Sequence, residues 1–472
     1  LTGGYMTAAN TPELKHKRMT ETPIPKLLFS LAVPTIVSML ISAFYNMADT
    51  YFIGMLGSAS ATAAVGVCFP MMAVLQAVGF MFGQGSGNFI ARELGAKKIK
   101  DAEEMASTAF FSAVITGFLL MFAGLALLPR LVVWLGSTVT IAPYAMDYAR
   151  NILFATPWLI ASIVLNNQLR LQGNAMFAMV GMTSGAIINI GLDPLFIFTF
   201  HMGVSGASMA TMISQMIAFV LLLLGTRRGD NLRIRFKRFT PAIGYFKGIL
   251  RGGLPALFRQ SIGSLAIVML NTAAGQMGDT VIAAFSIVFR IMMFVQMIVI
   301  GLGQGFQPIC GFNYGSGRYD RVREAYWFTV RISFFMLLAG AVCAFIFAPQ
   351  VIELFLKGYP EVTEIGSLAL RLQTFMLPFF SVLMMSSMML QTIGYVRNAS
   401  ILAVARQGLF LFPALLILPR FFGLLGLQLA QPIADCCAVI LSIPLGLHAL
   451  NGFKREEARP AEDGDAEIGR AH

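Results

Sequence analysis

Residues 83–85 read Gly-Gln-Gly, and residues 303–305 read Gly-Gln-Gly again, 220 positions further along the chain. Four other landmarks return with the same offset to within one position. The pairs are Val33-Pro34 with Leu254-Pro255, Gly95 with Gly315, Pro157 with Pro378, and Gly206-Ala207 with Gly426-Leu427. A long period that is kept across nearly the whole chain indicates two copies of one structural unit.

The composition around this repeat is that of a membrane protein. Apolar residues make up 57% of the 472 residues and charged residues only 12%, and the mean hydropathy is +0.73. Apolar stretches long enough to cross a hydrocarbon core of about 30 Å recur throughout. We predict twelve spans, at about 27–54, 61–88, 105–128, 139–168, 174–200, 203–225, 246–273, 280–308, 325–347, 361–391, 395–418 and 423–449.

The repeat divides these spans into two lobes of six, so the expected fold is an all-α integral membrane protein. Because six is an even number, both lobes enter the membrane in the same direction, and a pseudo-two-fold axis along the membrane normal should relate them. Repeats of this kind are typical of transporters, in which substrate binds near the lobe interface. The predicted segments are an amino-terminal tail (1–26), the first lobe (27–226), an inter-lobe loop (227–245), the second lobe (246–450) and a disordered tail (451–472).

The positions of Lys and Arg indicate the orientation, since basic residues collect in cytoplasmic segments. With both termini in the cytoplasm, inner segments carry 25 of the 34 basic residues, and the outer loops carry only Arg130, Lys357 and Arg420. We therefore expect a multi-pass protein of the cell (inner) membrane, with cytoplasmic tails and loop. This asymmetry explains the net charge of +11. It indicates contact with anionic membrane lipid and argues against a nucleic-acid partner.

No pattern in the chain is typical of an enzyme. The five cysteines lie in apolar spans without CxxC or His spacing, and the four histidines lie near or beyond span ends. No metal motif, phosphate loop or nucleophile elbow is present in the sequence. We therefore predict that the protein is not an enzyme and has no resident cofactor.

Four aspartates, Asp49, Asp147, Asp193 and Asp435, fall inside the predicted spans, where each charge costs at least about 2.5 kcal/mol to insert. At about 1.5 Å per residue, Asp49 and Asp193 lie at nearly the same depth, in the outer third of the membrane. Polar side chains reach the same level from the same or neighbouring helices; these are Tyr45, Asn189, Thr211 and Tyr148. Two carboxylates, an amide, a hydroxyl and phenols can thus converge in the first lobe.

The repeat tests whether these acids belong to the scaffold. Asp49 shifted by 221 lands on Leu270, and Asp193 shifted by 220 lands on Pro413. The shared fold therefore does not need them, and we interpret them as functional. Pairing with an intramembrane Arg is the alternative. For Asp147 both interpretations stay open, for Asp435 the structural one is favoured, and Arg259 and Arg290 either face a cleft or pack and snorkel.

Proline interrupts span 1 early, at Pro34. In a membrane, such a kink is tolerated where neighbours satisfy the freed carbonyl groups. We interpret Pro34 either as a hinge or as a static kink.

Taken together, Pro34, Asp49, Gly83-Gln84-Gly85, Gln172-Gly173 and Asn189-x-x-x-Asp193-Pro194 resemble the multidrug and toxic compound extrusion (MATE) family over about residues 25–450. The resemblance implies a twelve-helix efflux transporter that exchanges drugs for inward H⁺ or Na⁺. In one bacterial branch it implies a coupling site in the first lobe and an adjoining substrate cavity. The implied sets are Asp49, Asn189, Asp193 and Thr211 for the cation, and Tyr45, Tyr148 and Asn166 for the substrate. Another branch has an acid on span 7, and this chain has none near Gly263.

We therefore expect a multidrug antiporter that exports amphiphilic, cationic compounds by alternating access. Oxygens of carboxylate, amide and hydroxyl groups suit both H⁺ and Na⁺, so the coupling ion stays open, and Na⁺ is the only metal ion expected. A monomer is expected, because each chain contains both lobes. The alternative is a flippase for lipid-linked saccharides, although that function favours extra spans and a cationic cleft.

Overall fold

The computed structural model describes residues 12–356 and 358–457, and in these residues all regular structure is helical. The α-helices are α1 (Pro12–Glu21), α2 (Ile24–Gly54), α3 (Ala59–Gly95), α4 (Ile99–Ala126), α5 (Leu128–Trp134), α6 (Ala142–Leu171), α7 (Ala175–Pro194), α8 (Gly203–Thr226), α9 (Ile243–Gly275), α10 (Asp279–Gly315), α11 (Tyr319–Ile346), α12 (Ala348–Phe355), α13 (Pro360–Met376), α14 (Phe380–Ile393), α15 (Val396–Val404) and α16 (Leu411–Glu457). Short π-helices, η1 (Leu195–Thr199) and η3 (Ala405–Phe410), continue α7 and α15, and a 3₁₀ turn, η2 (Phe236–Arg238), lies in the inter-lobe loop.

Twelve membrane spans are present within the described residues. Ten helical segments are long and apolar enough to cross a bilayer, and α13 with α14 forms an eleventh span that bends by 56° around Pro378. The last of the ten segments, Val396–Phe453, is itself two spans, because Gly423 has non-helical φ and ψ angles of 55° and −131°. The predicted count is therefore correct, and most helices extend beyond the predicted spans at the end nearer α1.

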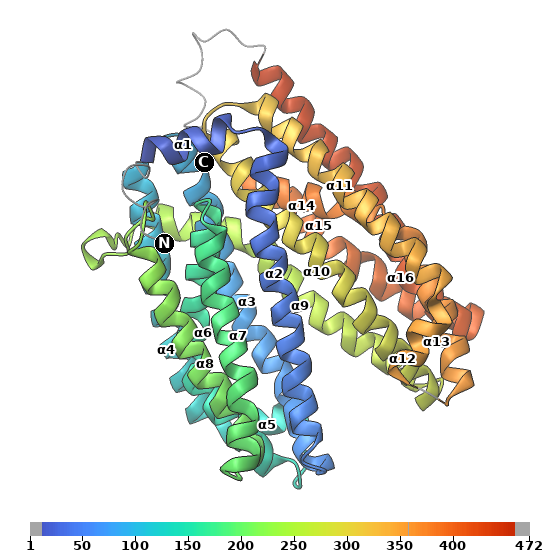
Figure 1. Cartoon of the computed structure of the whole chain (residues 1–472). Coiled ribbons are helices and arrows are strands. Elements are labelled where there is room, and N and C mark those ends of the chain that lie inside the picture. The colour runs from blue at the N-terminus through green and yellow to red at the C-terminus, as the bar shows by residue number, and fades with distance from the viewer. Residues whose placement is uncertain (1–11, 357, 458–472) are drawn as a thin grey trace, which may run out of the picture.

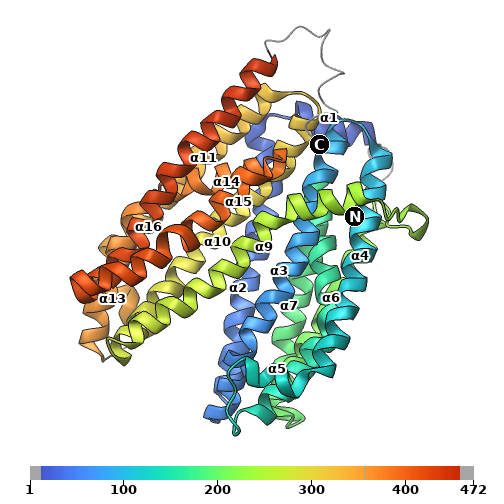
Figure 2. The ribbon, with the colours of Figure 1, turned by 180° about the vertical axis from the view of Figure 1, so that it is seen from behind.

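The spans form two bundles of six, shown from opposite sides in Figures 1 and 2. The first contains α2, α3, α4, α6, α7 and α8, and the second contains α9 to α11 and α13 to α16. The bundles lie together at the end of the molecule that carries α1, and their ribbons diverge toward the ends that carry α5 and α12 (Figure 1).

Several features lie outside the predicted bounds. The expected amino-terminal tail contains the helix α1, and the backbone of α1 and the turn after it accepts hydrogen bonds from Asn313, Arg318 and Arg321 of the second lobe. α16 continues past 450 to Glu457. The remaining predicted tail residues, 1–11 and 458–472, lie outside the described residues.

The short helices α5 and α12 were not predicted, and their first residues are 220 positions apart, so they belong to the repeat.

The repeat also fixes two tight turns. Gly203 and Gly423 occupy equivalent positions of the repeat and have φ angles of +57° and +55°, values that L-residues with a Cβ adopt only at a cost. Each turn lets the chain reverse between the last two spans of its lobe. Close packing follows three residues later, where a Cβ at Gly206 would crowd the Phe196 backbone and one at Gly426 would overlap the Leu418 carbonyl.

Gly423→Ala should therefore destabilise the protein by about 1–2 kcal/mol, through backbone strain. A suitable control is Gly452→Ala in the same helix, where an added methyl group meets nothing within 4 Å and the φ angle is helical. We expect thermal unfolding in detergent to show a lower Tm for Gly423→Ala and an unchanged or higher Tm for Gly452→Ala. Equal Tm values for the two variants would contradict the role of this turn.

Glycine also permits the two lobes to touch backbone to backbone at the α1 end. An added Cβ at Gly95 of α3 would overlap the carbonyl oxygen of Phe312 on α10, and one at Gly315 of α10 would overlap the carbonyl oxygen of Arg92 on α3. Arg92 and Phe312 are themselves equivalent positions of the repeat, so the contact is reciprocal. We call this contact between α3 and α9–α10, with its continuation on α2, the lobe seam.

The Gly-Gln-Gly segments lie on the same seam. A Cβ at Gly85 would overlap the Ile249 carbonyl on α9, and one at Gly305 would lie 2.6 Å from the Cα of Ala32 on α2. These distances exclude any larger residue without separation of the helices. The motif that reveals the repeat in the sequence is therefore the surface along which the lobes meet.

Candidate functional site

Helix α7 positions Asn189 and Asp193 one turn apart on the same face, and the bundle buries both side chains. The Asn189 amide donates to Asp193 Oδ1 at 3.4 Å and to Thr211 Oγ1 of α8 at 3.3 Å. With the amide rotated by half a turn, its nitrogen donates to Asp193 Oδ2 at 3.1 Å and its oxygen accepts from the Thr211 N–H at 3.2 Å. Either way, Asn189 links the carboxylate of α7 to α8.

Asp49 approaches this group from α2. Its side chain is half-buried, and within the described residues its Oδ1 atom is buried without a hydrogen-bond partner. The carboxylates of Asp49 and Asp193 lie near enough for their charges to act on each other. Neither acid forms an ion pair with any Arg or Lys in the described part of the chain, which contradicts the structural alternative for both.

A buried carboxylate oxygen that accepts no hydrogen bond can coordinate a cation. Two carboxylates that share one buried region repel each other unless a positive charge separates them or a proton neutralises one. Together with the Asn189 amide and the Thr211 hydroxyl, they form the kind of all-oxygen donor set that binds hard cations. The four residues predicted for the coupling site are therefore brought together, and their chemistry fits H⁺ or Na⁺.

Two tyrosines adjoin the acids, as predicted. The charges of Asp49 and Asp193 act on both Tyr45 and Tyr148. Tyr148 is only 1% exposed, and its hydroxyl lies 3.7 Å from the sulfur of Met72. Tyr45, on α2 one turn before Asp49, is half-buried. Contact of either ring with substrate stays a prediction.

A small cavity of about 30 Å³ lies between α2, α7 and α8 beside the acids. Its lining includes Tyr45, Asn189 and Thr211. This volume is about that of one water molecule. Ser42, Ser214 and Gln215 also line it, and the buried Ser214 hydroxyl has no partner among the described residues. Sequence reasoning missed these three residues. The available signal was that Ser214 follows Thr211 by three residues and Ser42 precedes Tyr45 by three, hence on shared helix faces.

Two predicted residues lie away from the acids. Asn166 on α6 donates to the carbonyl oxygen of Ala178 at 3.0 Å. Ala178 precedes Asn189 by three turns of α7, or about 16 Å, so the structure does not bring Asn166 to the acid cluster. Its assignment to the substrate cavity stays a prediction. Pro34 lies inside α2, which is one continuous helix from Ile24 to Gly54, so its role as a hinge also stays a prediction.

The other intramembrane acids have different environments. Asp147 is 57% exposed and lies 4.0 Å from Arg150 one turn further along α6. Asp435 accepts from Arg406 Nε at 2.7 Å and from Gln431 Nε2 at 2.7 Å, in the interior of the second lobe. Asp435 therefore has the structural partner that the sequence interpretation favoured. Arg290 is exposed.

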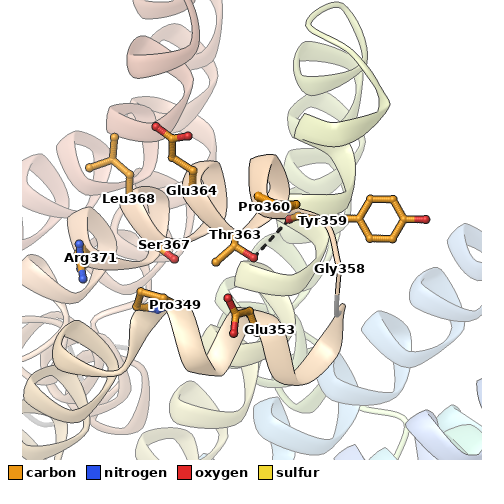
Figure 3. A pocket seen from close by; sticks show the side chains of 10 residues that line it. All are labelled: Pro349, Glu353, Gly358, Tyr359, Pro360, Thr363, Glu364, Ser367, Leu368 and Arg371. Atoms are coloured by element: carbon orange, nitrogen blue, oxygen red, sulfur yellow. Dashed lines mark hydrogen bonds between the residues drawn. The ribbon is translucent and has the colours of Figure 1, made fainter.

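A larger cavity of about 490 Å³ lies between α12 and α13 of the second lobe (Figure 3). Its lining includes Glu353, Glu364 and Arg371, and Thr363 donates to the Tyr359 carbonyl at its rim. None of the predicted site residues lines it. It is an open depression at the diverging end of the molecule, and the buried acids of α2 and α7 are in the other lobe.

Comparison with known proteins gives a consistent result. The MatE family model matches this chain twice, at residues 34–195 and 255–416, which is once in each lobe. Multidrug export protein MepA of Staphylococcus haemolyticus is 28% identical over 424 residues, covering 90% of this chain and 93% of that protein.

Solved structures agree with the family match. An outward-facing multidrug resistance MATE family transporter of the MOP superfamily superposes with a TM-score of 0.87 at 28% identity, covering 93% of this chain and 99% of that one. A crystal structure of MATE in complex with MaL6 gives a TM-score of 0.88, with the same identity and coverage.

Proposed function

This chain belongs to the MATE family of multidrug efflux transporters, and from that premise we propose that it is an antiporter that exports amphiphilic cations in exchange for inward H⁺ or Na⁺. It is a multi-pass membrane protein and a transporter, not an enzyme. We place it in the cell membrane as a monomer with both termini in the cytoplasm. In that orientation, the α5 and α12 ends face outward and the lobe seam closes the cytoplasmic side.

The observation that carries this proposal is the pair of acids in the first lobe with no basic partner in the described chain. Their location suits coupling. The rings of Phe44 on α2 and Phe294 on α10 lie 5.6 Å apart, so the lobes still touch at that level. Asp49 lies just over one turn further along α2, five residues before this helix ends at Gly54, and the ribbons of the two lobes diverge toward the α5 end of the molecule (Figure 1). A cation from the outside can therefore reach the acids when the lobes are splayed.

Competition for negative charge gives the exchange its direction. With both acids ionised, the cluster attracts a cationic drug that enters between the lobes. When H⁺ or Na⁺ arrives from outside and binds at Asp49 and Asp193, this attraction is lost and the drug is released outward. Asn189 holds the Asp193 carboxylate against α8 throughout, and Thr211 contributes its hydroxyl. Rocking of the lobes then opens the seam, and the coupling ion leaves to the cytoplasm.

Pro34 could allow α2 to bend during the transport cycle, in addition to the rocking of the whole lobes. It leaves the carbonyl group one turn before it without its helical N–H donor, so α2 bends there more easily than elsewhere. Since α2 carries Asp49 and Tyr45, bending would move both groups relative to α7. The hinge is thus a means by which cation binding reshapes the adjoining cavity.

The antiport is tested by ethidium transport in proteoliposomes, with a pH gradient, a sodium gradient or neither. We expect at least one of the two ion gradients to drive ethidium against its own concentration gradient. Each exchanged ion supplies about 1.4 kcal/mol per tenfold ratio of ion concentration. The ion that drives transport identifies the coupling ion. Transport that is equal in all three conditions would overturn the antiport and leave only facilitated diffusion.

A further inference from the structure

Arg170 and Arg259 lie at the lobe seam, and among the described residues both donate hydrogen bonds only to neutral groups. Arg170, at the end of α6 in the first lobe, is 2% exposed. It donates from Nη1 to the Gln304 carbonyl at 2.9 Å and to Gln307 Oε1 at 3.0 Å, and from Nη2 to Asn167 Oδ1 at 2.6 Å. Arg259, on α9 of the second lobe, is half-buried. The hydrogen-bond partners of the two arginines adjoin each other. Arg170 contacts Asn167, Arg259 contacts Gln84, and a Cβ added at Gly83, next to Gln84, would lie 3.0 Å from the Asn167 amide nitrogen. Two like charges therefore share this region.

Both arginines reach across the seam to equivalent positions of the repeat. Arg259 Nη2 donates to Gln84 Oε1 of the first lobe at 3.4 Å, and Arg170 donates to Gln304 of the second lobe. Gln84 and Gln304 are the central residues of the two Gly-Gln-Gly segments. The arginines themselves have no counterparts, because their repeat-equivalent positions are Gln391 and Ser38. The positive charge is therefore an addition to the symmetric seam.

Three N–H donors in this group have no acceptor in the described structure. These buried atoms are Arg170 Nε, Arg259 Nη1 and Gln307 Nε2. Among the described residues, no Asp or Glu lies within ion-pair distance of either guanidinium. A buried charge without a counter-charge strongly destabilises a fold, and unsatisfied donors add to that cost. The region therefore lacks a negative group that accepts hydrogen bonds.

We propose that the seam binds a small inorganic anion, such as chloride, between Arg170 and Arg259. An anion offers only acceptors, which is what the three free donors require, and it separates the two positive charges. It must be small, because helix packing leaves only 2% of Arg170 exposed. A lipid phosphate that carries acyl chains does not suit so enclosed a place.

The anion links to the transport cycle through the seam. Rocking of the lobes pulls Arg170 away from Gln304 and Arg259 away from Gln84, which opens the site. The anion then binds more tightly when the seam is closed, and by linkage it stabilises that state. The anion site is built from other residues than the coupling site at Asp49, so anion binding can be measured without any ion gradient.

The test is the thermal stability of the purified protein in detergent, in sodium gluconate and in sodium chloride of equal ionic strength, at up to about 150 mM. We expect chloride to raise the Tm by about 2 °C or more and in a saturable way. Arg259→Gln should abolish this rise, Arg259→Lys should keep part of it, and the exposed control Arg290→Gln should keep all of it. Bromide seen between the two arginines by anomalous diffraction would locate the site directly.

Two outcomes would overturn the proposal. The wild-type protein would show no difference between chloride and gluconate if water alone satisfies the free donors. An equal chloride response in Arg259→Gln and Arg290→Gln would place anion binding elsewhere. Unfolding of Arg259→Gln that is still cooperative in gluconate shows that the variant folds, so loss of its chloride response reports on the site. Failure of the antiport in vesicles would leave this measurement unaffected.

Discussion

Asp49→Asn should lower the accumulation of ethidium in inside-out vesicles relative to the wild type. If one proton is exchanged per drug, the expected loss is about tenfold for each pH unit of imposed gradient. One pH unit supplies about 1.4 kcal/mol, which supports a tenfold concentration ratio. The amide cannot take up a proton, and it lowers the negative charge available to Na⁺. It also leaves Asp193 without the neighbouring carboxylate that acts on it. The variant should therefore bind ethidium more weakly and lose its response to either ion gradient.

Asp147→Asn is the matched control, because it makes the same chemical change in the same lobe. The Asp147 side chain is 57% exposed and adjoins Arg150 rather than the buried cluster. Exposed ion pairs contribute little to the stability of a protein. We expect its accumulation to equal that of the wild type, and Asp193→Asn to behave like Asp49→Asn. If Asp49→Asn matched Asp147→Asn, the coupling site would lie elsewhere.

Gly315→Ala should shift the protein away from the seam-closed state by about 1–3 kcal/mol, the usual cost of an overpacked contact, which is a factor of about 5 to 150 in population. The added methyl group would overlap the Arg92 carbonyl oxygen, and a backbone atom cannot rotate aside as a side chain can. Because each transport cycle must close the seam, ethidium transport should fall by a similar factor. Gly95→Ala should have the same effect through the reciprocal contact with Phe312.

The chain contains a natural reporter for this shift. Cys310 on α10 is fully buried, and at its neighbour Gly311 an added Cβ would lie 2.6 Å from the Cβ of Ala91 on α3, so Cys310 lies at the seam. With the other four cysteines replaced by Ser, labelling of Cys310 by a water-soluble maleimide should be about tenfold faster in Gly315→Ala than in the parent. The control is Gly340→Ala on α11, where an added Cβ meets nothing within 4 Å. Labelling that is equally slow in both variants would mean that the seam tolerates the methyl group.

Much of the fold was predictable because it depends on short-range or one-dimensional properties. A bilayer sets the length of each span, so apolar stretches alone predict twelve helices. The repeat predicts two lobes, and it pairs Gly206 with Gly426 and Gly95 with Gly315 as positions with the same structural role in each lobe. The level of an acid follows from counting residues along a helix, and this was enough to group Asp49 with Asp193.

The partners of each side chain were not predictable in the same way. They depend on how each helix is rotated about its axis and on which helices are neighbours, and the packing of all the spans decides both. Packing directs Asp435 toward Arg406 and leaves Asp49 Oδ1 without a donor among the described residues. It places Asn166 against Ala178, away from the acids, and directs Arg170 toward Gln304 and Arg259 toward Gln84 across the seam. The sequence by itself thus determined which charged groups enter the membrane and at what depth. Only the tertiary structure decided which of them are compensated, because compensation requires a second group from a distant part of the chain.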